Sequence, residues 1–288
     1  MTVTVGHALA EVAVRLAAAG IDNPRLEARL LVAAATGMLP TALFAHPEIP
    51  LGPGPAEALA ALAGRRTARE PMSHILGQRE FWGLPIRVSA DTLTPRPDSE
   101  TLIEAVLAWL KGRKAEALRL LDLGTGSGCL LLALLHELPR ADGLGIDASP
   151  DALAVARGNG EALGLADRAT FQEGNWGQGR EGPFDVIVSN PPYIPTADIA
   201  GLMPEVRDHE PRRALDGGPD GLDAYRALLP DAVRLLARGG GLFLEVGAGQ
   251  ADTVATLGKA LGLRLLEVRN DLAGISRCVA FASGRPER

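Results

Sequence analysis

From residue 118 onward, short apolar strands alternate with apolar helices along the chain. Strand-like segments are expected at 118–123, 143–147, 169–173, 184–190 and 241–246, and helical segments at 129–138, 150–164, 222–237 and 250–261. Such alternation is typical of a mostly parallel sheet with helices on both faces. Two further strand-like segments, 263–270 and 276–282, follow each other without a helix. They predict an antiparallel hairpin at one edge of the sheet.

The first 75 residues have a different pattern, with apolar positions at helical spacing. They predict three helices, at 6–20, 22–37 and 54–70. The second helix begins after the capping residues Asp22 and Asn23, has Pro24 in its first turn and ends at Gly37. No catalytic cluster is visible among these residues, and we expect a small helical domain.

Residues 76–98 are expected to join the two parts. Two short strands flank Gly83 within 79–88, and the proline-rich segment 92–100 precedes a helix at 99–111. We therefore divide the chain into a helical domain at 1–75, a hairpin and proline-rich bridge at 76–98, and an α/β domain at 99–288.

Charge and cysteine content exclude several classes of protein. The net charge is −6, and no basic footprint of the kind that duplex nucleic-acid binders carry is visible. Cys129 and Cys278 are far apart, and the five histidines form no spaced ligand set, so neither a disulfide framework nor a metal site is expected. No membrane-spanning segment or signal peptide is seen, and we expect a cytoplasmic protein.

A glycine-rich loop, DLGTGSG at 122–128, lies between a predicted strand and a predicted helix. The pattern G-x-G-x-x-G of dinucleotide sites is absent, because its last position falls on Cys129 or Leu131. A nucleoside without a pyrophosphate is therefore the favoured ligand. Asp147 ends the next strand, where an acidic residue can hold ribose hydroxyls.

Polar residues follow several predicted strands. Asp122, Asp147, Asn175 and Asn190 lie at or just after strand ends. Because ligands bind at the carboxyl ends of strands in open α/β sheets, we expect these four residues to lie around one pocket.

The segment NPPYIP at 190–195 follows a strand of β-branched residues and forms a rigid end that is rich in hydrogen-bond acceptors. Proline has no N–H and holds the residue before it extended, so Asn190 and Pro191 present oxygens that cannot join a helix. The Asn190 side chain and the Pro191 carbonyl can each accept one hydrogen of a planar amino group, and Tyr193 can pack on its face. Such acceptors orient the nitrogen lone pair without a strong base. S-adenosylmethionine, a phosphate-free nucleoside with an electrophilic methyl group, completes this chemistry.

Together these motifs resemble the release factor glutamine N5-methyltransferases of the HemK type. The similarity covers DLGTGSG, GID, NW and NPPYIP, the bridge PMSHILGQREFWGLPIRVSADTLTPRPDSE and the closing NDLAGISRCVAFA. It implies a Rossmann-like seven-stranded methyltransferase sheet with a small helical N-terminal domain that docks the substrate. The implied reaction methylates the glutamine of a Gly-Gly-Gln loop in peptide chain release factors, a step connected with translation termination.

The resemblance also implies the site residues. Those assigned to the cofactor are Gly124, Thr125, Gly126, Ser127, Gly128, Asp147, Trp176 and Asn190. Those assigned to catalysis are Asn190, Pro191, Pro192 and Tyr193. Where the family commonly has an aspartate before the tryptophan, this chain has Asn175, which can accept from the adenine amine but carries no charge.

Three alternatives stay open at this point. NPPY is shared with enzymes that methylate adenine N6 in DNA or RNA, which would need base flipping and a basic surface. A non-enzymatic adapter that binds the cofactor and an NAD-dependent dehydrogenase are weaker alternatives, because NPPY is intact and the dinucleotide pattern is absent. We expect a monomer that binds release factors and makes no direct contact with nucleic acid.

Overall fold

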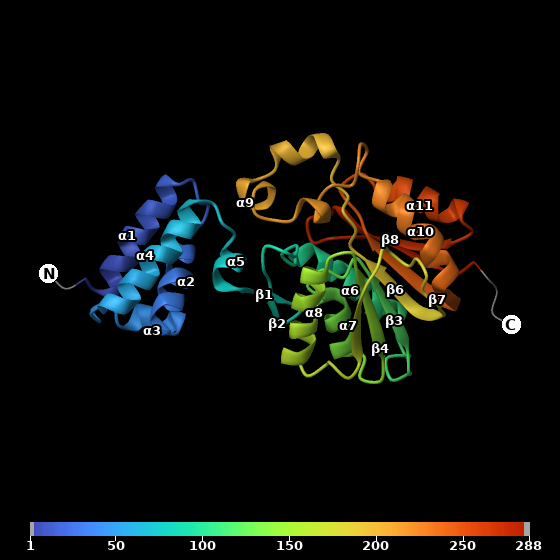
Figure 1. Ribbon diagram of the computed structural model, residues 1–288, viewed down its shortest axis with the longest axis horizontal. Coiled ribbons are helices and arrows are strands. Elements are labelled where there is room, and N and C mark those ends of the chain that lie inside the picture. Colours follow the sequence, from blue (N-terminus) through green and yellow to red (C-terminus); the bar gives the residue numbers. More distant parts are fainter. Residues whose placement is uncertain (1–2, 285–288) are drawn as a thin grey trace. The chain divides into compact units, whose positions relative to one another are not determined.

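The computed structural model describes residues 3–284, which divide into two compact units (Figure 1). The helical unit contains the chain up to Gly77 together with the short segment Met203–His209. The sheet unit contains Gln78–Leu202 and the chain from Glu210 onward. A segment from the second half of the chain is therefore part of the first unit, which the sequence pattern does not indicate.

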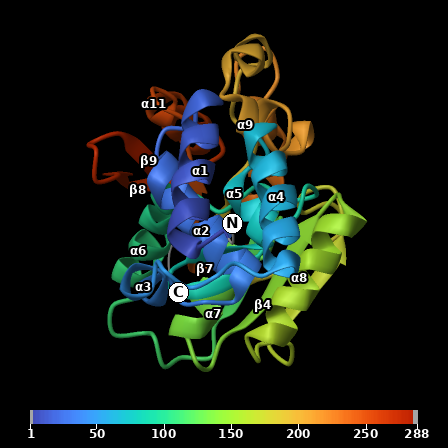
Figure 2. The same cartoon turned by 90° about the vertical axis from the view of Figure 1, so that its left-hand side faces the viewer.

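The helical unit is built on three longer helices and two short ones. Their bounds are α1 Val5–Ala18, α2 Pro24–Thr36, α3 Pro40–Ala45, α4 Pro53–Thr67 and α5 Met72–Leu76. Figure 2 shows α1, α2 and α4 side by side, and buried residues such as Leu16, Leu31 and Leu59 pack between them. The three predicted helices correspond to α1, α2 and α4. The short helices α3 and α5 were not predicted, because five or six residues are too few to show a helical period.

Local signals at α2 were partly correct. Pro24 occupies the first turn, and Gly37 ends the helix in the left-handed conformation, with φ at 70°. The expected cap was wrong in detail, since the Asn23 side chain makes no capping hydrogen bond. Thr4 caps α1 instead, and its hydroxyl oxygen accepts from the backbone N–H of His7 at 3.3 Å.

The sheet unit contains a seven-stranded sheet in the order β5-β4-β3-β6-β7-β9-β8, which confirms the predicted fold class. The strands are β3 Arg119–Leu123, β4 Asp142–Asp147, β5 Ala169–Glu173, β6 Phe184–Ser189, β7 Leu236–Glu245, β8 Arg264–Asn270 and β9 Ser276–Ala282. The first five are parallel, and the β8–β9 hairpin joins antiparallel to β7 through β9. The predicted hairpin is confirmed, with the last strand lying inside the sheet and β8 at its edge.

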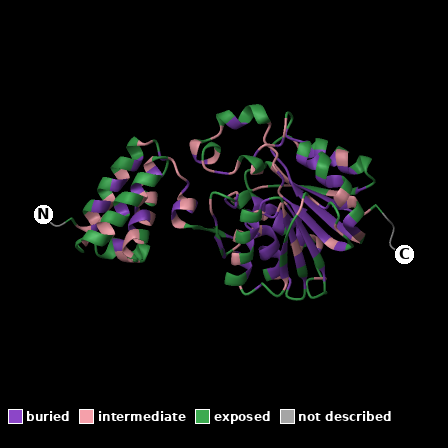
Figure 3. Ribbon diagram, viewed as in Figure 1, coloured by how far each residue is buried: buried purple, intermediate pink, exposed green. Residues whose placement is uncertain are grey.

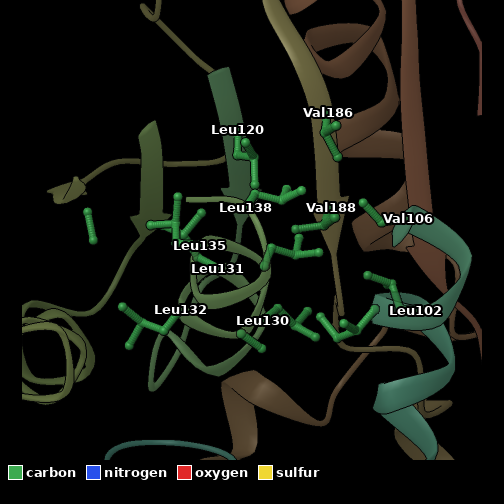
Figure 4. Close-up of a cluster of buried hydrophobic side chains, with 14 of the residues drawn as sticks. Leu102, Val106, Leu120, Leu130, Leu131, Leu132, Leu135, Leu138, Val186 and Val188 are labelled. Atoms are coloured by element: carbon green, nitrogen blue, oxygen red, sulfur yellow. The ribbon is translucent and has the colours of Figure 1, made fainter. Parts of the chain in front are cut away.

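Helices cover both faces of the sheet (Figure 1). Their bounds are α6 Glu100–Trp109, α7 Cys129–Glu137, α8 Pro150–Ala162, α10 Asp223–Leu235 and α11 Ala251–Ala260. Successive strand residues point to opposite faces, so Leu120 packs with α6 and α7 while Leu121 packs with α10 and α11. Figure 4 shows the first of these clusters, and Figure 3 shows that the central strands of the sheet are mostly buried.

Two further regions connect the main elements. The predicted hairpin around Gly83 is formed by β1 Gln78–Phe81 and β2 Leu84–Arg87, and the turn η1 Pro97–Ser99 leads into α6. Between β6 and α10 lie three short elements that were not predicted: η2 Thr196–Gly201, α9 Pro204–Arg207 and η3 Arg212–Ala214. Throughout residues 3–284, no helix combines the length and the apolar character needed to cross a bilayer.

Candidate active site

The strand order reverses between β3 and β6, which are neighbours in the sheet. Ligands in open α/β sheets bind outside the carboxyl ends of the strands at such a reversal. A cavity lies there, lined by the segments that follow β3, β4, β5 and β6 and by the segment before α6. The predicted residues that line it are Gly124, Thr125, Gly126, Ser127, Asp147, Asn175, Trp176, Asn190 and Pro192. Gly128, Pro191 and Tyr193 are not among the lining residues.

The glycine loop bends back over the end of β4. Gly124, Gly126 and Gly128 have φ values of 75°, 55° and 80°, which side chains other than glycine rarely adopt. The backbone N–H groups of Gly124 and Thr125 both donate to the Ile146 carbonyl, at 2.8 and 2.9 Å. A Cβ at Gly126 would meet no atom within 4 Å, so the loop leaves open space beside the cavity.

Asp147 connects the glycine loop to the start of α8. Its Oδ2 accepts from the backbone N–H of Gly126 and its Oδ1 from that of Ser149, each at 2.9 Å. Each carboxylate oxygen keeps a further lone pair, so the side chain can still accept from hydroxyl groups in the cavity. Asp147 therefore both shapes the loop and offers a negative charge to a ligand.

Asp122 lies below the loop and does not line the cavity. The prediction that four polar residues at strand ends lie around one pocket is therefore wrong for Asp122. Its side chain is fully buried, and Oδ2 accepts from the Thr125 hydroxyl at 2.6 Å. Burial, with the nearby charge of Asp147, raises the pKa of Asp122 to about 7, against the opposing Thr125 hydrogen bond. Asp122 supports the loop from inside the protein and has no access to a ligand.

Trp176 has a left-handed backbone with φ at 51°, which is uncommon for a residue other than glycine. Its ring packs against the glycine loop, and a Cβ at Gly124 would lie 3.3 Å from Cζ3 of the indole. Neighbouring Asn175 also lines the cavity. The pair places a flat aromatic surface and an amide next to the loop.

The NPPY segment follows β6 directly. The Asn190 side chain is half-buried, lines the cavity, and donates from Nδ2 to the Ser99 hydroxyl at 3.3 Å. The Tyr193 hydroxyl donates to Oε1 of Glu245 at 3.4 Å. The backbone carbonyl of Tyr193 accepts from Nε2 of Gln250 at 2.9 Å. Burial and the charge of Glu245 raise the pKa of Tyr193, so its phenol stays protonated.

Several residues around the cavity were not assigned from the sequence. Arg96, Ser99 and Arg213 line it. Arg96 donates to the buried carboxylate of Glu210 at 2.7 Å, and Arg213 donates to the Ser149 hydroxyl. Arg213 belongs to the irregular segment between β6 and α10, where no hydrophobic periodicity in the sequence indicates its position in the fold. Arg96 and Ser99 both lie in the proline-rich segment 92–100, which the sequence predicts to be rigid.

Two family profiles match the chain. One is described as the PrmC N-terminal domain and matches residues 7–77, and the other is described as a methyltransferase domain and matches residues 114–257.

Curated relatives match almost the full chain. A protein of Rhodospirillum rubrum named release factor glutamine methyltransferase is 52% identical, over 96% of this chain and 84% of that protein. Proteins of the same name from Bradyrhizobium diazoefficiens and Caulobacter vibrioides are 50% and 45% identical. Those alignments cover 93% and 97% of this chain and 91% and 96% of the relatives.

Among solved structures, the fold is similar to the hMettl16 catalytic domain in complex with MAT2A 3′UTR hairpin 6. The TM-score is 0.60 at 16% identity, over 75% of this chain and 82% of that one. A methyltransferase from Pyrococcus furiosus gives a TM-score of 0.51 at 20% identity, over 70% of this chain and 90% of that one. At these identities the similarity concerns the fold alone.

Proposed function

The chain belongs to the release factor glutamine methyltransferase family, and from this membership we propose which of its residues carry the reaction. The protein is an S-adenosylmethionine-dependent methyltransferase that methylates a glutamine of peptide chain release factors. We place the transferred methyl group on the side-chain N5 of the glutamine in the Gly-Gly-Gln motif. Relatives with this name at 42–52% identity favour this reaction over methylation of adenine N6.

The residues of the cavity suit this cofactor. Asp147 keeps lone pairs for ribose hydroxyls, and the Trp176 ring and the Asn175 amide suit a flat, amine-bearing base. The open space beside Gly126 lets a ligand approach the backbone closely. We assign Gly124, Thr125, Gly126, Ser127, Gly128, Asp147, Trp176 and Asn190 to the cofactor site.

The cofactor supplies an electrophilic methyl group, and the NPPY segment prepares the nitrogen that receives it. The lone pair of an amide nitrogen is delocalised into the carbonyl, so the nitrogen is a poor nucleophile. The Asn190 side-chain oxygen and the Pro191 carbonyl each accept a hydrogen bond from one of the two amide N–H groups. These hydrogen bonds increase the electron density on the nitrogen and fix the direction of its lone pair. Pro192 and Tyr193 hold these acceptors in place. When the methyl group passes from the sulfonium sulfur to the nitrogen, the nitrogen becomes acidic and releases one of its two protons on the side of its acceptor, to water, so no strong base is needed.

One observation supports this arrangement above the others. Nδ2 of Asn190 is already engaged with Ser99 at 3.3 Å, which leaves the side-chain oxygen as the part of the amide that is available to a substrate. An acceptor at this position suits one of the two hydrogens of a primary amide.

We further propose that the helical domain, residues 1–75, docks the protein substrate. A glutamine side chain offers one small group to the cavity, so discrimination among the glutamines of a cell must come from surface outside it. We propose a cytoplasmic monomer that recognises release factors through protein contacts, without direct binding of nucleic acid.

The direct test mixes the purified protein with methyl-labelled S-adenosylmethionine and either release factor, DNA or RNA. Label is expected on release factor, and peptide mapping should place it on the glutamine of the Gly-Gly-Gln motif. Label on nucleic acid at a comparable rate would overturn the proposed substrate.

A further inference from the structure

Two of the four residues in NPPY are prolines, which have no backbone N–H. At Pro191 and Pro192 the backbone can therefore be fixed only through its carbonyl groups or by packing. The proposed reaction needs this backbone to stay in one place, because the Asn190 oxygen and the Pro191 carbonyl must both face one amino group. Other segments of the chain have to supply what fixes it.

The side chain of Gln250 supplies hydrogen-bond donors at the end of NPPY. Its Nε2 donates to the Tyr193 carbonyl at 2.9 Å and to the Gly221 carbonyl at 3.3 Å. Its Oε1 accepts from the backbone N–H of Gly247 at 3.0 Å. Two carbonyls on the nitrogen and one N–H on the oxygen allow a single orientation of the amide. Gln250 therefore joins NPPY, the loop 216–222 before α10 and the turn that follows β7.

Gln250 is itself anchored at the end of β7. Its backbone N–H donates to the Gly247 carbonyl at 3.1 Å, so main chain and side chain together close the turn between these two residues. Helix α11 begins at the next residue, Ala251. A group carried between a strand end and a helix start keeps its position more precisely than a group on a loop.

The loop 216–222 and Leu215 before it pair with the chain that follows NPPY. The backbone N–H of Ile194 donates to the Leu215 carbonyl at 3.0 Å, and the Ile194 carbonyl accepts from the N–H of Gly217 at 2.8 Å. The loop is therefore attached to the residue directly after Tyr193 by two backbone hydrogen bonds.

Glycines let this loop approach NPPY more closely than other residues could. A Cβ at Gly217 would lie 2.9 Å from the Pro192 carbonyl oxygen. A Cβ at Gly221 would overlap the Tyr193 carbonyl oxygen and lie 2.6 Å from Nε2 of Gln250. The backbone of NPPY is thus packed tightly against the loop as well as hydrogen-bonded to Gln250.

We propose that Gln250 is a positioning residue for the methyl transfer, and that it acts together with the loop 216–222. It fixes the backbone of NPPY, so that the two acceptors face the substrate amide in one geometry. Gln250 is not among the residues that line the cavity, so it acts through NPPY and not on the cofactor. This inference rests on the proposed function of NPPY and adds what keeps that segment in place.

The test compares the full-length wild type with Gln250→Glu and Gln250→Ala at saturating S-adenosylmethionine. Glutamate has the shape of glutamine, but its carboxylate only accepts and would face two carbonyls, and alanine removes the amide. Each variant is expected to lower kcat on release factor by about 10- to 100-fold, as a small displacement of a reacting group does. Calorimetric affinity for S-adenosylmethionine should stay close to that of the wild type.

Matched variants control for the substitutions. Gln78→Glu makes the same change at an exposed residue of β1 and should leave kcat unchanged. Gly217→Ala disturbs NPPY from the loop, because the new Cβ would lie too close to the Pro192 carbonyl, and should lower kcat with cofactor affinity retained. Gly201→Ala is its control, since a Cβ there meets no atom within 4 Å. If neither Gln250 variant folds, the two glycine variants carry the test.

A double variant separates positioning from general support of the fold. In the Asn190→Ala background, Gln250→Glu should lower kcat by a smaller factor than in the wild type, because one of the two acceptors that it positions is already gone. Equal factors in the two backgrounds would mean that Gln250 does not act through NPPY, and would overturn the inference.

The outcomes distinguish this inference from the function on which it rests. If Asn190→Ala is impaired while the Gln250 variants and Gly217→Ala turn over normally, the positioning role is wrong and the role of Asn190 stands. The positioning role is equally wrong if these variants lose cofactor affinity in proportion to kcat. If Asn190→Ala itself turns over normally, the proposed function of the NPPY segment is wrong.

Discussion

Asn190 offers the sharpest test at the scale of single residues. Replacing it with alanine removes the proposed acceptor of a substrate amide hydrogen and should lower kcat by about 10²–10³-fold, as loss of one preorganised group does. Its effect on cofactor affinity should be modest, because several other residues line the same cavity. Steady-state kinetics with release factor and calorimetry with S-adenosylmethionine measure the two quantities separately.

Asn175 provides the matched control, as a second asparagine that lines the cavity. Asn175→Ala should weaken cofactor binding and leave kcat at saturation nearly unchanged. Equal losses of kcat in Asn190→Ala and Asn175→Ala would contradict the proposed role of Asn190 as the acceptor of a substrate amide hydrogen.

Asp147 is expected to affect binding rather than chemistry. A charged hydrogen bond contributes on the order of 1.5–3 kcal/mol, so Asp147→Ala should weaken S-adenosylmethionine affinity by about 10- to 100-fold. The interaction is similar in the ground and transition states and should appear in KM rather than in kcat. The structure adds a second reason for weaker cofactor binding in this variant, because Asp147 also accepts from the backbone N–H of Gly126 at 2.9 Å.

Calorimetry of Asp147→Ala beside Asp151→Asn checks this prediction. Asp151 is an exposed carboxylate in the first turn of α8, so its removal should leave affinity unchanged. Unaltered affinity in the Asp147 variant would take this residue out of the cofactor site.

At the scale of elements, the segment Met203–His209 stands out because it packs within the helical unit. Glu205 in α9 is 8% exposed, and its carboxylate accepts from Arg66 at 3.0 Å and from Arg69 at 2.8 Å. Arg66, itself 5% exposed, is paired on its other side with Glu27 at 2.6 Å. The two contacts of Glu205 join residues that lie 139 and 136 positions apart in the sequence.

Glu205→Gln should therefore destabilise the helical unit. The substitution leaves the buried Arg66 with one carboxylate instead of two, at a cost of about 1–3 kcal/mol. Thermal unfolding followed by circular dichroism measures the effect. Asp208→Asn removes an exposed carboxylate from the same segment and should leave Tm unchanged. Equal Tm values for the two variants would show that the buried pair does not stabilise the unit.

At the scale of the whole molecule, the proposed docking of release factor on the helical domain can be tested by its own substitution. A truncation near residue 80 is a poor test, since it would remove the partners of Glu205. Phe44 in α3 is a better target, because the residue is 66% exposed and its ring centroid lies 4.9 Å from the Arg29 guanidinium. Phe44→Ser should raise KM for intact release factor and leave cofactor affinity unchanged.

Leu272→Ser is the matched control for Phe44→Ser. It removes another exposed apolar side chain, in the turn between β8 and β9 of the sheet unit. Its kinetics should match those of the wild type. If Phe44→Ser also behaves as wild type, this face of the helical domain is not where release factor docks.

Most of the sheet unit could be predicted because its signals are local. The alternation of strand and helix, the glycines after β3 and the proline pair after β6 each act on the backbone next to them, whatever lies elsewhere. For the same reason Asp147, Asn175 and Asn190 could be expected together, since the carboxyl ends of parallel strands meet at one edge. The family resemblance added the substrate, which no local pattern specifies.

Only the tertiary structure decided the pairings and the burial that depend on residues far apart in the sequence. The region between β6 and α10 has no periodicity, so its association with Arg66 and Arg69 could not be read from the chain. Ser99 and Asn190 are 91 residues apart, and nothing in either segment indicates the other. Asp122 and Asp147 are both carboxylates at strand ends, yet packing buries the first and leaves the second at the cavity. Local sequence determines backbone conformation, whereas burial and pairing are set by the elements that pack around a residue.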